Sequence, residues 1–184
     1  MSPPRILSVD LGARHLGWAA QAGNAVQYGL IEMPGIKHPG ELYACTRNEL
    51  ERIIVRYEPR FMRFAPAFIA AGRTSTQVGK VLTGQQAVLE LVAFDNEIDL
   101  EPINERSARK QVLGQCDFGR IDARTGKFIP DSGREEAKAL VMLWCRDRGF
   151  FPASHDVGDA LVLLHYDASR RAAKKALASG FSSA

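Results

Sequence analysis

The sequence lacks the features of secreted, disulfide-rich and membrane proteins. Its 184 residues include three cysteines, Cys45, Cys116 and Cys145, which are widely separated and have no CxxC spacing. This pattern excludes a disulfide framework and a common zinc site. No apolar run approaches the roughly 20 residues that span a bilayer, and the first residues, MSPPR, do not resemble a signal peptide. We therefore expect reduced thiols, no membrane partner and a cytoplasmic location.

A strong charge of either sign is also missing from most of the chain. The 24 Lys and Arg residues nearly balance the 21 Asp and Glu residues, for a net charge of +3. The exception is a basic C-terminal tail, at about 170–184, which contains Arg170, Arg171, Lys174 and Lys175 and no acidic residue. Such a tail suits a nucleic-acid backbone, and a solvated helix end is an equally good interpretation.

The order of apolar runs predicts one α/β domain over residues 1–184. Hydrophobic residues make up 46% of the chain, enough for a sizeable core, and no internal repeat divides it. Pattern and turn signals predict five strands, at 5–10, 16–23, 25–33, 61–68 and 98–103. They predict helices at 41–57, 76–96, 105–113, 134–148 and 156–178, with an insert loop or small hairpin at about 115–133.

This order indicates a five-stranded mixed sheet with helices on both faces. The first three strands are joined by short turns, among them Gly23-Asn24, and are expected to be antiparallel. The last two follow helices and are expected to be parallel to the first strand. The layout is that of the ribonuclease H-like fold.

Three aspartates are candidates for a metal site. Asp10 ends the first strand, while Asp156 and Asp159 begin the last helix after a good N-cap, Ser154. Acids at a helix start are ordinary, but a spacing of three puts both on one face, about 5–6 Å apart at Cβ. If this helix packs on the sheet, its start lies beside Asp10. Clustered carboxylates without basic partners need cations, and oxygen ligands favour Mg²⁺ or Mn²⁺.

Five stretches in order carry a family resemblance: ILSVDLGARHLGWA, LTGQQAVLELVAF, INERSARKQVLG, EEAKALVMLWC and ASHDVGDALVLL. Across about residues 5–168 the chain resembles the RuvC family of Holliday junction resolvases, especially its phage and prophage branch. The resemblance implies a structure-selective endonuclease that resolves four-way or other branched DNA by two-metal hydrolysis. It also implies Mg²⁺, replaceable by Mn²⁺, no nucleotide cofactor, a homodimer, and a bacterial or phage-infected cytoplasm.

The resemblance assigns roles to particular residues. The catalytic aspartates fall on Asp10, Asp156 and Asp159, which would hold the metals, and a functional lysine falls on Lys138. The predicted DNA contacts from the resemblance are Arg73, Lys80, Arg106, Arg109 and Lys110. Arg14 is added because it lies in the turn just after Asp10. For Arg14, Arg73, Lys80 and Lys138, an ordinary solvated position is the alternative. Gly79 and Gly84, in the helix that serves dimerisation in the family, suit close helix packing.

One position departs from the family pattern. Members carry a glutamate at the end of the fourth strand, where this chain has Ala65 in the sequence FAPAF. No acid lies between Pro59 and Gln77 to replace it. We predict impaired cleavage, through a substitution introduced to disable the enzyme or a natural loss of activity. A different register, with another acid in this role, is the third explanation.

Other functions remain open from the sequence. A non-catalytic branched-DNA-binding protein would explain Ala65. A YqgF-like RNA nuclease has the same fold, but the helix-rich length and the D-x-x-D motif at 156–159 disfavour it. A nucleotide-binding domain of the actin and sugar-kinase superfamily needs two such domains, for which the chain is too short.

Overall fold

The computed structural model describes residues 5–33, 38–66, 76–116, 118–119, 122–126, 129 and 133–180, with side chains up to 177. Arg73, a predicted DNA contact, lies outside the described residues. None of the three cysteines forms a disulfide bond, and Cys145 is buried. In the described part of the chain, no helix is both long and apolar enough to cross a membrane.

The predicted mixed sheet is confirmed. It has five strands in the order β3-β2-β1-β4-β5, with β1 in the centre. β1 (Ile6–Leu11), β2 (His15–Ala22) and β3 (Ala25–Glu32) are antiparallel neighbours. β4 (Phe61–Ala65) and β5 (Asp99–Pro102) run parallel to β1. The carboxyl ends of these three parallel strands therefore meet at one edge of the sheet.

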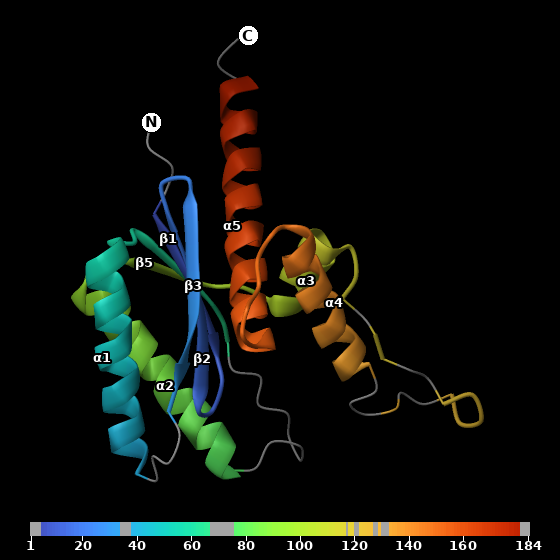
Figure 1. The fold of residues 1–184 in the computed structure, drawn as a ribbon, viewed down its shortest axis with the longest axis horizontal. Coiled ribbons are helices and arrows are strands. Elements are labelled where there is room, and N and C mark those ends of the chain that lie inside the picture. The colour runs from blue at the N-terminus through green and yellow to red at the C-terminus, as the bar shows by residue number, and fades with distance from the viewer. Residues whose placement is uncertain are drawn as a thin grey trace.

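Helices cover both faces of the sheet, as Figure 1 shows with the sheet nearly edge-on. On one side lie α1 (Pro39–Tyr57) and α2 (Thr76–Asp95). On the other lies α5 (His155–Gly180), against which α3 (Glu105–Leu113) and α4 (Arg134–Asp147) pack. The helix bounds agree with the sequence prediction to within two residues, while β4 ends earlier than predicted, at Ala65.

Strand alternation divides the core into two layers and sets the direction of Asp10. Leu7 and Val9 belong to the core beneath α1 and α2, whereas Ile6 belongs to the core beneath α5. Ser8, between Leu7 and Val9 in the strand, faces α5: its Oγ donates a hydrogen bond to the carbonyl of Ala160, at 2.7 Å. Because side chains alternate along a strand, Asp10 also faces α5.

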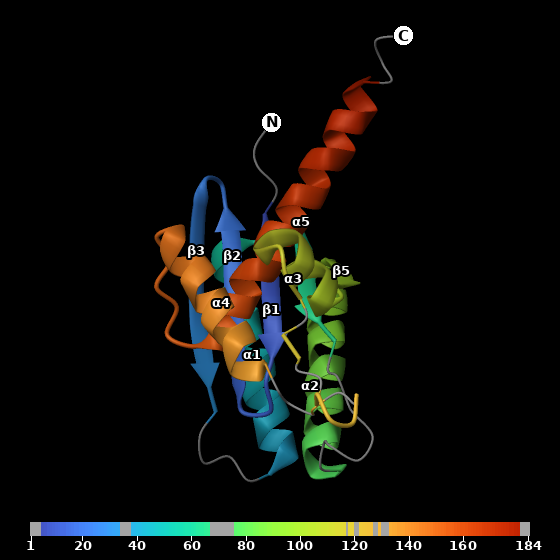
Figure 2. The ribbon, with the colours of Figure 1, turned by 90° about the vertical axis from the view of Figure 1, so that its right-hand side faces the viewer.

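The basic tail is more tightly tied to the body than the sequence suggests. Residues 170–180 form the last part of α5, which extends past the sheet (Figures 1 and 2). Arg170 pairs with Glu101 of β5 at 2.8 Å, and Arg171 pairs with Asp167 at 2.5 Å. Only Lys174 and Lys175, of the four basic residues described there, are exposed to solvent. Two of the four charges are therefore already compensated within the chain.

Gly84 has a packing role inside the chain. A Cβ at this position would lie 2.1 Å from the hydroxyl of Tyr43, so the missing side chain lets α1 and α2 approach. Tyr43 in turn donates a hydrogen bond to the carbonyl of Lys80. The small profile read from the sequence as a dimer feature is thus used between two helices of one chain, and the homodimer stays a prediction.

Candidate active site

Asp10 and Ala65 lie side by side at the carboxyl edge of the parallel strands. They are register partners in the parallel pairing of β1 with β4. Ala65 belongs to the core beneath α5, the side that Asp10 also faces. The residue next to Asp10 on β4 is therefore an alanine, and an acid in the role of the family glutamate would have to come from another element.

Gly17 allows the start of α5 to reach Asp10. It is the antiparallel partner of Asp10 on β2. A Cβ on Gly17 would lie 2.2 Å from the carbonyl oxygen of Asp156 and 2.6 Å from the amide nitrogen of Val157. Real Cβ atoms do not approach backbone this closely, so a side chain here would push α5 off the sheet. The start of α5 is also capped as predicted, since Ser154 Oγ accepts a hydrogen bond from Val157 at 3.4 Å.

The carboxylates have a basic partner, which corrects the sequence analysis. Arg109 of α3 donates from Nη2 to both oxygens of Asp159, at 2.9 and 3.0 Å, and from Nε to Oδ1 at 3.2 Å. The same Nη2 lies 2.5 Å from Oε1 of Glu105, one turn earlier on α3. Arg109 was predicted to contact DNA phosphates, but its guanidinium is engaged inside the carboxylate cluster.

Burial and like charges raise the pKa values of two aspartates. Burial raises the pKa of Asp10 well above its usual range, and the charges of Asp159, Glu105 and Asp156 add to the rise. Burial also raises the pKa of Asp159 to about 6; Arg109 opposes this rise, while Glu105 and Asp156 add to it. The cluster as a whole is therefore short of positive charge.

The donor set fits one divalent cation better than two. In the described part of the chain, no three His, Cys, Asp or Glu side chains already stand at metal-ligating positions. Mg²⁺ usually keeps several waters and needs only one or two carboxylates, which Asp10 and Asp156 can supply. A second ion would need Asp159, whose oxygens hold Arg109, and a ligand from position 65, where alanine offers none.

Lys138, another predicted site residue, and His155 each have a charged partner. Lys138 of α4 pairs with Glu135 at 3.1 Å, the ordinary helix-face contact considered as its alternative. His155, at the start of α5, lies 3.1 Å from Asp156. The structure thus brings together Asp10, Ala65, Asp156 and Asp159, and gives Lys138 a partner outside this group.

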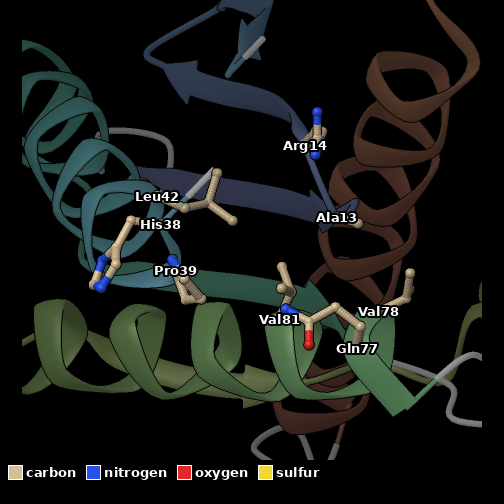
Figure 3. Close-up of a pocket in the computed structure, with 8 residues that line it drawn as sticks. All are labelled: Ala13, Arg14, His38, Pro39, Leu42, Gln77, Val78 and Val81. Carbon is tan, nitrogen blue, oxygen red and sulfur yellow. The ribbon is translucent and has the colours of Figure 1, made fainter. Parts of the chain in front are cut away.

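The other predicted DNA contacts that the structure describes are on the surface. Arg14, Lys80, Arg106 and Lys110 are all exposed. Arg14 lies in the turn between β1 and β2, and lines a small pocket at the starts of α1 and α2 (Figure 3). The lining residues are Ala13, Arg14, His38, Pro39, Leu42, Gln77, Val78 and Val81. This pocket lies among α1 and α2, whereas the carboxylates face α5.

Glu105 is a site residue that the sequence analysis missed. It follows β5 and begins α3 after its N-cap, Asn104, whose side chain accepts a hydrogen bond from Ser107. An acid in a first helical turn looks ordinary, as it did for Asp156. The available signal was its place just beyond a predicted parallel strand, because such strands end at the same edge of the sheet as Asp10.

Comparisons with known proteins identify the fold. No family model matches the sequence, and no curated protein matches it. The solved structure of Thermus thermophilus RuvC in complex with a Holliday junction substrate is similar, with a TM-score of 0.61 and 14% identity, over 88% of this chain and 90% of that one. The structure of T. thermophilus RuvC gives 0.58 and 12%, over 86% and 90%.

A eukaryotic structure is similar as well. The yeast mitochondrial Holliday junction resolvase Ydc2 gives a TM-score of 0.53 and 11% identity, over 87% of this chain and 75% of that one. Identities this low speak to the fold alone. The five-stranded mixed sheet, its strand order and these likenesses together show that the chain has a RuvC-like ribonuclease H fold.

Proposed function

We propose that this chain is a structure-selective endonuclease for four-way or other branched DNA, with cleavage impaired at Ala65. One observation carries the proposal. In a fold shared with a resolvase solved on a Holliday junction, Asp10 and the start of α5 meet at the carboxyl edge of the central strands. Ligands of open α/β sheets bind outside this edge.

Asp10 and Asp156 would hold a divalent cation, Mg²⁺ or Mn²⁺. Among the described residues Asp10 has no ion-pair partner, and its pKa is raised first by burial and then by the negative charges of Asp159, Glu105 and Asp156. Bound there, the cation would activate a water and stabilise the oxygen that leaves the phosphodiester. Gly17 keeps Asp156 close enough to Asp10 to share this task.

DNA would be recognised mainly through its phosphates. The exposed side chains of Arg14, Lys80, Arg106 and Lys110 can bind the backbone, which fixes orientation without reading sequence. A four-way junction has approximate two-fold symmetry, so a homodimer with two identical sites would suit paired nicks on opposed strands. We place this activity in a bacterial or phage-infected cytoplasm.

A non-catalytic branched-DNA-binding protein is the second candidate. It is favoured by the alanine next to Asp10 and by the engagement of Asp159 with Arg109. Both features reduce the capacity of the cluster for metals without touching the exposed basic residues. The two candidates share junction binding and differ in cleavage.

The test compares the chain with Ala65→Glu on a labelled synthetic four-way junction, in Mg²⁺ and in Mn²⁺. A gel shift in Ca²⁺ measures binding, and a linear duplex of the same sequence is the control for structure selectivity. We expect both proteins to bind the junction in preference to the duplex. Ala65→Glu should nick it at least about tenfold faster, because members of a catalytic unit act together.

A further variant tests whether the nicking depends on Asp10. Adding Asp10→Asn to Ala65→Glu should remove the nicking and leave binding intact. Binding without nicking in every variant would favour the non-catalytic candidate. If neither protein prefers the junction to the duplex, the resolvase proposal is wrong.

A further inference from the structure

Arg109 brings a positive charge into the carboxylate cluster, which consists of Asp10, Asp156, Asp159 and Glu105. Its guanidinium fork contacts both oxygens of Asp159 and, through the same Nη2, the carboxylate of Glu105. The Asp159 side chain is 6% exposed and that of Arg109 is 19% exposed, so water screens this pair weakly. Bidentate pairs of this kind are among the stronger and more directional ion pairs in proteins.

The cluster is therefore divided into two unlike halves. At Asp159 the negative charge is met by Arg109 in direct contact, whereas Asp10 makes no ion pair with any described residue and feels the charge of Arg109 only without contact. A divalent ion at Asp159 would have to displace the guanidinium or bind beside it against charge repulsion. Next to Asp10, Ala65 removes both a ligand and a negative charge that a second ion would use.

We propose that Arg109 takes the place of a second metal ion, so that the chain binds one divalent cation, held by Asp10 and Asp156. Glu105, whose side chain is 42% exposed, steadies the guanidinium from its outer side. When ionised, Asp10, Asp156, Asp159 and Glu105 carry four negative charges, of which one divalent ion and one guanidinium would balance three. This inference rests on the proposed function, because it concerns the same site.

Two features of the site, the alanine at position 65 and the pairing of Arg109 with Asp159, then act together to prevent binding of a second ion. A site that holds two ions needs the carboxylate at 65 and both oxygens of Asp159. Restoring only one of these should leave the second ion poorly bound. Restoring both should create a complete second position.

The test is the number of Mn²⁺ ions bound per chain, measured by calorimetry and by the EPR signal of free Mn²⁺, without DNA. We expect one ion for the unmodified chain and one for Ala65→Glu. Arg109→Gln should bind a second ion weakly. Ala65→Glu combined with Arg109→Gln should bind two, the second at least about tenfold more tightly than in Arg109→Gln alone.

Two further variants separate this proposal from general effects of charge. Arg47 is a matched control, because it also joins two carboxylates, Glu51 at 2.7 Å and Asp95 at 3.1 Å, far from the site. Arg47→Gln should leave the stoichiometry at one. Arg109→Lys keeps the charge but loses the fork, so its second ion should bind more weakly than that of Arg109→Gln.

Several results would overturn the proposal: two ions in the unmodified chain, none in it, or an unchanged stoichiometry of one in folded Arg109→Gln. Far-UV circular dichroism checks that each variant folds. If a variant misfolds, the number of Mn²⁺ ions bound by the unmodified chain still tests the proposal, because two ions or none would overturn it. The junction gel shift is run alongside. Its failure would speak against the proposed function, whereas a wrong ion count with intact junction binding would speak only against this role of Arg109.

Discussion

Two arginines reach aspartates of the same helix in two different surroundings. Arg63 of β4 pairs with Asp167 at 2.9 Å, and Arg109 of α3 pairs with Asp159, about two turns earlier on α5. Arg63 and Asp167 are each 2% exposed. Arg63 also donates to the carbonyls of Met62 and Asp99, at 2.9 Å each.

The difference lies in how completely each charge is satisfied. Arg63 is enclosed by carbonyls and carboxylates, and Asp167 receives a second cation, Arg171, at 2.5 Å. Among the described residues, the hydrogen bonds and ion pairs of Arg109 are all to carboxylates, and the neighbouring Asp10 makes no ion pair. A closed network of this kind holds α5 on the sheet, whereas an incomplete one leaves a place for ligands.

The largest expected effect is from breaking the closed network. Asp167→Ala leaves Arg63 buried without its main partner, and such losses typically cost about 3–5 kcal/mol. Urea unfolding should show this decrease in the free energy of unfolding. Asp95→Ala, in the exposed pair with Arg47, is the control and should cost at most about 1 kcal/mol. Equal losses would mean that burial of the Arg63 pair contributes nothing special.

Asp159→Asn should cost much less than Asp167→Ala. It weakens the pair with Arg109, but it also removes a charge that raises the pKa of Asp10, and Glu105 still contacts Arg109. We expect a change in the free energy of unfolding within about 1.5 kcal/mol of zero. The same urea experiment measures it. A loss as large as that of Asp167→Ala would show that the two networks have the same structural role.

The pH dependence of stability should reveal the incomplete network. The pKa of Asp159 is raised to about 6, so between about pH 4 and 6 the folded state binds more protons than the unfolded state. This contribution favours folding at low pH and is lost as the pH rises through 6. From pH 7 to pH 5, the unmodified chain should therefore gain about 1 kcal/mol of unfolding free energy relative to Asp159→Asn.

The unmodified chain is compared with Asp159→Asn because His165 changes the pH dependence of stability in the opposite direction. Burial lowers the pKa of His165, so acidification destabilises the folded state through this residue in both proteins. The difference between them cancels this effect. Urea unfolding at pH 5 and pH 7 makes the measurement, and no difference in slope would contradict the arrangement at Asp159.

The smallest expected effect is on the salt dependence of junction binding, which should differ between variants of Arg109 and of its exposed neighbour Lys110. If Lys110 binds a phosphate, Lys110→Ala should weaken junction binding and reduce the slope of log K against log salt by about 0.9. Arg109→Gln should leave this slope unchanged, because its guanidinium already serves carboxylates. Gel shifts at several salt concentrations measure both. A reduced slope for Arg109→Gln would return this residue to the DNA interface.

The sequence by itself determined the order of strands and helices and the places of the three aspartates. Apolar periodicity and turn residues carry that information locally, as in the buried run 160–164 of α5 and the turn at Gly23. The position of Ala65 beside Asp10 also followed, because the parallel pairing was correctly expected.

Only the tertiary structure decided which charges meet. Arg109 and Asp159 are 50 residues apart in the chain, and nothing local distinguishes Arg109 from its basic neighbours Arg106 and Lys110. The same holds for Arg63, which lies in a short strand and reaches Asp167 of α5 across the face of the sheet. Ion pairs between distant elements depend on which faces the packing turns toward one another, and that choice is made by the whole core rather than by any segment of the sequence.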